Sequence, residues 1–107
     1  MQAAELVNQI VLKSKSSTQN SRGGEVITYT TVATVAAAAH PIRGREYEMF
    51  HVAGSDIDIR FTIYYREDVG AGWRVTWRGQ DYEVIGPPID VNAKKMWLEL
   101  MCRTAQN

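Results

Sequence analysis

The sequence has one cysteine, no long apolar run and no excess of either charge among its 107 residues. A single cysteine, Cys102, excludes an internal disulfide and a zinc site built on cysteine pairs. The longest small-apolar stretch, residues 35–39, is far shorter than the roughly 20 residues that span a bilayer. Residues 1–5 lack the basic start and apolar core of a signal peptide. We therefore expect synthesis in the cytoplasm and no membrane partner.

The balanced charge argues against a general nucleic-acid-binding protein. Twelve Lys and Arg face twelve Asp and Glu, whereas phosphate-binding proteins usually carry a basic excess. Neutrality also removes the self-repulsion that keeps small proteins apart, which suits a protein that associates. The chain length and a hydrophobic content of 45% predict a single folded domain over residues 1–107.

No arrangement of side chains predicts catalysis, a metal site or a cofactor. There is no Gly-x-Ser-x-Gly or phosphate-binding glycine loop, and the serines gather in one polar stretch. Two histidines and two nearby aspartates match no common spacing of metal ligands; they are His40, His51, Asp56 and Asp58. Cys102 falls on the inward face of its strand, where a free cysteine acts as a small hydrophobe. We predict that the protein is not an enzyme.

Strand patterns dominate the chain. The clearest is an unbroken alternation over residues 57–66, which is typical of a half-buried strand. Residues 26–39 are rich in Val and Thr and end at His40-Pro41. Two further strands, 73–78 and 82–85, flank a tight turn at Gly79-Gln80, and a final strand follows Met96. Residues 7–13 fit either a strand or an amphipathic helix, and we favour the strand.

The remaining segments predict loops and one short helix. Residues 14–25 contain no large apolar side chain, which indicates an exposed, mobile loop. Residues 44–53 carry the best helical pattern, inside a connector that covers residues 41–56. Residues 89–95 are predicted to be another loop. The expected fold is mainly β: a small antiparallel β-barrel of about six strands with one short α-helix.

The segment 73–78 alternates aromatic and basic side chains and has two interpretations. A platform for single-stranded nucleic acid needs both kinds on one exposed face. In a strand, however, Trp73 and Trp77 point one way while Arg74 and Arg78 point the other. We therefore predict core tryptophans with solvated arginines, and a nucleic-acid-binding barrel remains a rival function.

The order of these features resembles the phage head–tail joining family, whose members are also called head-closure, stopper or head–tail adaptor proteins. The similarity extends over residues 7–104, and each motif alone is common. The matching stretches, in chain order, are residues 18–25, 29–37, 41–47, 57–66, 72–75, 78–85 and 98–103. Two departures stand out, namely Trp97 beside the last strand and Pro87-Pro88 with its less charged linker.

The resemblance implies a structural protein of the virion neck. It implies a homo-oligomeric ring, a hexamer or a dodecamer, which closes the DNA-filled head below the portal or adaptor and offers the tail a docking surface. Partners would be other copies, the portal or adaptor protein and tail proteins, with packaged DNA only nearby in the channel. A tail-terminator-like ring is the alternative within the same fold class.

The resemblance also implies two sets of contact residues. The candidate channel-side or subunit-contact residues are Arg43, Arg45, Glu46, Tyr47 and Glu48. The candidate assembly loop contains Gln19, Asn20, Arg22, Gly23 and Gly24. The residues themselves leave a second interpretation open for the first set, because acidic side chains near a helix N-terminus are also simply favourable solvated charges.

Overall fold

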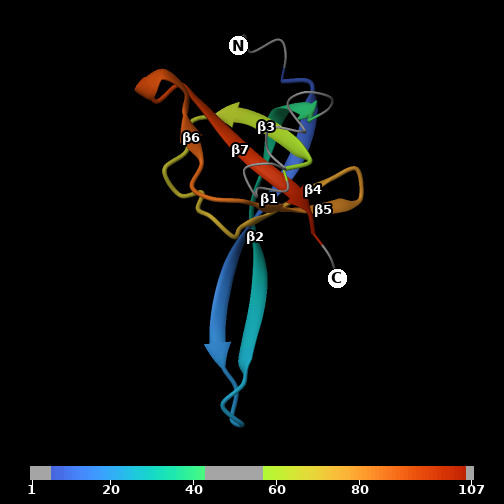
Figure 1. Ribbon diagram of the computed structural model, residues 1–107, viewed down its shortest axis with the longest axis vertical. Helices are drawn as coiled ribbons and strands as arrows, with labels where there is room; N and C mark the ends of the chain where they lie inside the picture. The colour runs from blue at the N-terminus through green and yellow to red at the C-terminus, as the bar shows by residue number, and fades with distance from the viewer. Residues whose placement is uncertain (1–5, 43–56, 106–107) are drawn as a thin grey trace.

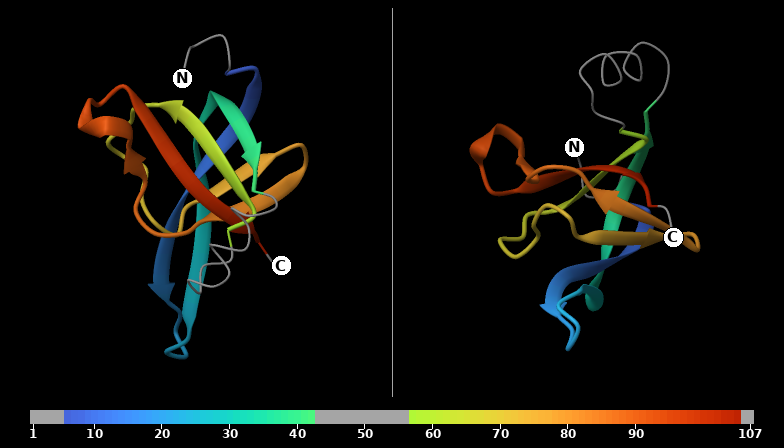
Figure 2. Two further views of the ribbon diagram at one scale, coloured as in Figure 1. Left: turned by 45° about the horizontal axis from the view of Figure 1, so that its top comes forward. Right: turned by 60° about the horizontal axis from the view of Figure 1, so that its bottom comes forward.

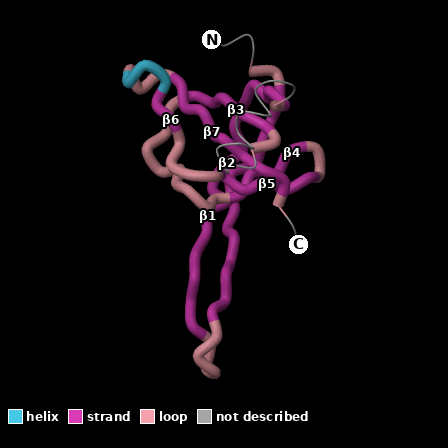
Figure 3. The backbone as a smooth tube through the Cα atoms, viewed as in Figure 1, coloured by secondary structure: helices cyan, strands magenta, loops and turns pink. Residues whose placement is uncertain are grey.

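The computed structural model describes residues 6–42 and 57–105, and within them it is built almost entirely of β-strands (Figure 1). Seven strands follow one another along the chain: β1 (Asn8–Gln19), β2 (Glu25–Pro41), β3 (Ile59–Tyr64), β4 (Arg74–Trp77), β5 (Gln80–Val84), β6 (Ile89–Asp90) and β7 (Trp97–Thr104). A single 3₁₀ turn, Val91–Ala93, lies between β6 and β7. Figure 3 shows this dominance of strand along the backbone.

The strands form one antiparallel sheet that closes into a ring. The order is β3-β2-β1-β4-β5-β7-β6, and an additional pairing of β3 with β7 joins the two sides. The short strand β6 pairs only with β7 and lies outside the closed circuit. The ring is uneven, because β1 pairs with β2 along its whole length but with β4 only at Val11–Lys13. Figure 2 shows the crossing strands from two further directions.

The core fills the inside of this ring, and strand alternation determines which residues enter it. Phe61 is completely buried and its ring meets Trp77 and Tyr82 edge-on, with both centroid separations at 5.6 Å. Such edge-to-face pairs are favourable beyond the area they bury. The fully enclosed larger side chains are Phe61, Ile10, Leu12, Ile63, Leu100, Val75, Val84 and Cys102.

The strand predicted at residues 57–66 is present but shorter, as β3. Its predicted inward residues Ile57, Ile59, Phe61 and Ile63 are buried, but Thr62, which was predicted to point outward, is buried as well. The inward face predicted for the last strand is confirmed for Leu98, Leu100 and Cys102, whereas Met96 precedes the strand and is exposed. The N-terminal segment is a strand from Asn8, which decides between the two interpretations of residues 7–13.

Two loop predictions need correction, and the predicted helix lies outside the described residues. Residues 14–19 are not loop but the outer half of β1, and only Asn20–Gly24 forms a turn. The predicted loop at 89–95 contains β6 and the 3₁₀ turn, because Ile89 and Asp90 pair with Glu99 and Leu98. The helix expected at 44–53, and most of the 41–56 connector, lies outside the described residues.

The tight hairpin between β4 and β5 follows the chemistry of its turn. Trp77 pairs with Gln80, so the two loop residues are Arg78 and Gly79. Their φ angles are 51° and 77°, as a type I′ turn requires at both central positions. The turn is at Arg78-Gly79, one residue earlier than the predicted Gly79-Gln80, because the glycine occupies the second of the two central positions.

The outer halves of β1 and β2 form a two-stranded ribbon, residues 14–31, which we call the arm. Beyond Lys13 these strands pair only with each other within the described chain, and the ribbon extends away from the ring (Figure 1). A β-bulge between Leu12 and Lys13 marks its root, with Val32 as the additional residue of β2. Bulges bend and twist a strand, which suits the change from ring to free ribbon.

Candidate functional site

The described residues offer no site for a metal ion. Within residues 6–42 and 57–105, no group of three or more His, Cys, Asp or Glu side chains could hold a metal ion. Of the four candidate metal ligands, His51 and Asp56 lie outside the described residues. The third, Asp58, accepts a hydrogen bond from the backbone N–H of Thr104 at 2.8 Å. It therefore stabilises the pairing of the last strand.

The thiol of Cys102 is enclosed in the core, and burial raises its pKa above the ordinary value. A raised pKa means less thiolate, and the thiolate is the reactive form. We expect the native protein to be inert to Ellman's reagent near pH 8 and to release one equivalent of chromophore per chain in guanidinium chloride. Rapid reaction without denaturant would show that the core opens at Cys102.

The tryptophans and arginines of residues 73–78, the segment that contains β4, take different positions in the structure. Trp73 and Trp77 are partly buried and pack against the core, as predicted. Arg78 lies in the turn after β4 with a positive φ, and its guanidinium lies over the Trp77 ring at 4.7 Å. Arg74 lies over the ring of Tyr29 at 4.1 Å, which holds the root of the arm against β4. Cation–π contacts of this kind help to fix structure.

The arm is the most prominent exposed feature of the described chain, and its two faces differ. Directly paired residues of an antiparallel ribbon share a face, and successive residues alternate between faces. One face, which we call the hydroxyl face, carries Ser14, Ser16, Thr18, Val26, Thr28 and Thr30. The opposite face carries Lys15, Ser17, Gln19, Glu25, Ile27, Tyr29 and Thr31. Since all except Ser14 and Tyr29 are exposed, the arm contributes little to the core.

The predicted assembly loop lies at the tip of the arm. Asn20 organises the turn, because its side-chain oxygen accepts hydrogen bonds from the N–H groups of Arg22 at 2.9 Å and Gly24 at 2.8 Å. Gly23 has a φ of 79°, where a residue with a Cβ is disfavoured. Gln19 ends β1, so the structure brings the five predicted residues together at one end of the molecule. The other predicted set, residues 43 and 45–48, lies outside the described residues.

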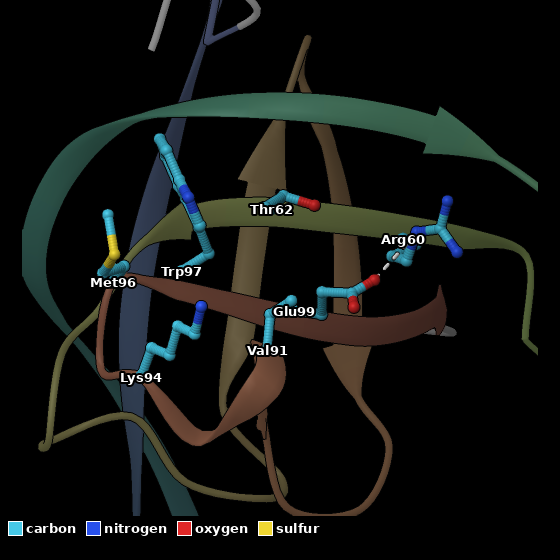
Figure 4. A pocket seen from close by; sticks show the side chains of 7 residues that line it. All are labelled: Arg60, Thr62, Val91, Lys94, Met96, Trp97 and Glu99. Atoms are coloured by element: carbon cyan, nitrogen blue, oxygen red, sulfur yellow. Dashed lines mark ion pairs between the residues drawn. The ribbon is translucent and has the colours of Figure 1, made fainter. Parts of the chain in front are cut away.

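A second surface was not predicted from the sequence. The rings of Tyr64 and Trp97 stack on the outside of β3 and β7, with centroids 5.1 Å apart, and Met96 beside them is 57% exposed. A pocket of about 310 Å³ opens next to this pair (Figure 4). Its lining residues are Arg60, Thr62, Val91, Lys94, Met96, Trp97 and Glu99. The sequence offered one signal for this surface, because strand alternation places Trp97 on the outward face of the last strand.

The floor of this pocket is held by an ion pair across the two strands. Arg60 Nε lies 3.2 Å from a carboxylate oxygen of Glu99, and Figure 4 shows the pair beside Thr62. Lys94 reaches toward the opening from the segment after β6 (Figure 4). Aromatic and Met side chains are enriched in protein interfaces, so this surface is suited to binding rather than to chemistry.

Comparison with solved structures agrees with this fold. A solution structure of the protein SF1141 from Shigella flexneri 2a superposes with a TM-score of 0.80 at 22% identity, covering 100% of this chain and 99% of that one. No curated protein matches the chain. The fold defines a small protein built on one antiparallel sheet that closes into a ring.

The family is shown by a sequence match along almost the entire chain. The family model described as phage head completion protein matches residues 1–105. The chain therefore belongs to the phage head completion protein family, and the resemblance seen in its motifs is confirmed. It is a structural protein of head closure and a virion component of the head–tail region.

Proposed function

We propose that this protein assembles as a homo-oligomeric ring below the portal or its adaptor, closes the DNA-filled head and presents the docking surface for the tail. The observation that carries the proposal is the head completion family match over residues 1–105. The fold supports it, because a closed β-ring is a rigid body and the exposed arm and aromatic surface remain free to bind partners.

The partners proposed are other copies of the chain, the portal or adaptor protein, and tail proteins. A hexamer or dodecamer fits a neck component, and packaged DNA lies near the protein in the channel without being gripped. The zero net charge supports this, since a phosphate-gripping ring would need basic excess. No helix of the described residues is long and apolar enough to cross a membrane.

Two sets of residues are proposed to make contacts in the assembly. The tip of the arm, residues 19–24, contacts a neighbouring protein in the neck. Arg43, Arg45, Glu46, Tyr47 and Glu48 face the channel or a neighbouring subunit. Reversing the charges of Arg43 and Arg45 is expected to reduce DNA retention in filled heads. Unchanged assembly and retention in that double variant would remove this segment from the channel.

The first experiment is electron microscopy of a lysate from the phage that carries this chain, with its gene deleted. We expect heads that have lost their DNA and lie apart from complete, unattached tails. A plasmid-borne copy of the gene should restore joined particles, which controls for effects on neighbouring genes. Normal infectious particles from the deletion would contradict the proposed function, and filled heads with aberrant tails would instead favour a tail-terminator-like role.

A further inference from the structure

The arm leaves two long strand edges without a partner in the described chain. β1 is paired on its second side only at Val11–Lys13, so the edge of residues 14–19 is open. β2 is paired on its second side only at Ala38–Pro41, so the edge of residues 25–37 is open. Figures 1 and 2 show the ribbon standing clear of the other strands.

The open edge of β2 lacks the usual protection against strand pairing. Residues 26–39 contain no charged residue, no proline and no glycine, and they consist mainly of Ala, Thr and Val. Natural edge strands are normally kept apart by lysine, proline, bulges or short length. Here the only such feature is the bulge at the root of the arm. High β-propensity with low charge is also the composition that pairs most readily with another strand.

Exposed apolar side chains on both faces of the arm also favour further packing. Val26 and Ile27 are 42% and 45% exposed, and they lie directly opposite Thr18 and Ser17 on β1. A two-stranded ribbon is only marginally stable in water without further strands or a covering surface. An arm of this length and composition therefore has its most stable arrangement inside a larger sheet.

From these edges we infer that the arms of neighbouring copies pair edge to edge, β2 of one copy with β1 of the next, in a continuous antiparallel sheet around the ring. The inference rests on the proposed ring. A ring of identical subunits needs two different, matching surfaces on each chain. The two arm edges are different surfaces of this kind. Because β1 and β2 run antiparallel, placing β1 of the next copy beside β2 continues the alternation.

Ring symmetry restricts which side chains can meet at the new strand pair. Rotation carries the hydroxyl face of one arm onto the hydroxyl face of the next, so residues of the same face must lie opposite each other. Thr28 of one copy must therefore oppose Ser14, Ser16 or Thr18 of its neighbour. Opposite residues of paired strands have Cβ atoms about 4.5–5.5 Å apart, which is close enough for introduced cysteines to be oxidised to a disulfide.

Cysteine cross-linking in assembled particles tests the inference. The phage is grown with two plasmid copies of the gene, one encoding Thr28→Cys and the other Ser14→Cys, Ser16→Cys or Thr18→Cys. We expect a covalent dimer after mild oxidation in one of the three mixtures, and none in particles that carry a single variant. Each chain has one exposed thiol, because Cys102 is buried, so no larger species should form.

The outcomes separate the arm pairing from the proposed function. Particles that contain the chain but give no dimer in any mixture would overturn the arm pairing and leave the head-closure role intact. Dimers from a single variant would show like edges in contact, which also overturns head-to-tail pairing. Particles without the chain would overturn both proposals.

A second measurement uses the unmodified protein, so it tests the inference even where the cysteine variants fail to assemble. Amide hydrogen exchange over residues 25–37 is compared between the purified protein and assembled particles. We expect strong slowing on assembly, because new strand pairing protects amides on the open edge. Residues 59–62 of β3, which are already paired on both sides, serve as the internal control. Unchanged exchange over 25–37 in particles would contradict the inference.

Discussion

Replacing Phe61 with alanine is expected to lower the free energy of unfolding by about 3–5 kcal/mol, a large part of the stability of a small domain. Phe61 is fully buried and is the shared partner of Trp77 and Tyr82 in the ring's interior. Its removal leaves a cavity and also breaks two edge-to-face contacts. Urea unfolding followed by tryptophan fluorescence measures the loss through the midpoint at constant slope.

The matched control is Tyr64→Ala on the same strand. Tyr64 points outward, is 53% exposed and stacks on Trp97, so its loss is expected to cost about 1 kcal/mol or less. Equal destabilisation by the two substitutions would show that the interior of the ring is not the main source of stability. A Phe61→Leu variant, which keeps much of the volume, should fall between them.

Shortening the arm is expected to abolish phage production while leaving the fold intact. The change replaces residues 17–27 with Asn-Gly, which joins the directly paired Ser16 and Thr28 through a two-residue turn of the favoured type. The removed side chains are exposed and belong to no core cluster, so the unfolding midpoint should move little. Complementation of the gene deletion should fall to the level of the empty plasmid.

The control for this variant is Arg78→Asn at the other hairpin. It installs the same Asn-Gly turn at residues 78–79 between β4 and β5, far from the arm in sequence, and should complement fully. Normal titres from the shortened arm would remove the arm from assembly and return attention to the pocket beside Trp97. A shortened protein that unfolds on its own would show that the arm stabilises the ring.

The strands that could be predicted from the sequence are those in which apolar and polar residues alternate. Apolar residues around Phe61 on β3 recur with a two-residue period in the sequence, and these apolar side chains are buried in the ring. The turn at Arg78-Gly79 was nearly located because glycine is favoured at its second position. These signals are local, so they can be read from the chain itself.

The β1 half of the arm was missed because no local signal distinguishes it from a loop, whereas the β2 half was predicted as strand. Residues 14–19 are polar and bury nothing, yet they form a strand since each residue pairs with β2 across the hairpin. Pairing partners depend on the path of the chain, which composition does not reveal. The stacked Tyr64 and Trp97 were missed for a similar reason, because they meet only through the register of β3 with β7.

Strand pairing between arms does not by itself fix the number of copies that associate. An open β2 edge accepts a β1 edge equally well in a closed ring and in an endless helical filament, and only the angle between successive copies decides which forms. Since the edge of residues 25–37 is uncharged beyond Glu25, repulsion does not limit growth either. The number of subunits must then be imposed by the surface on which they collect. In the proposed ring, the arms would hold neighbouring copies together, and the portal or adaptor below which they assemble would set the number of copies.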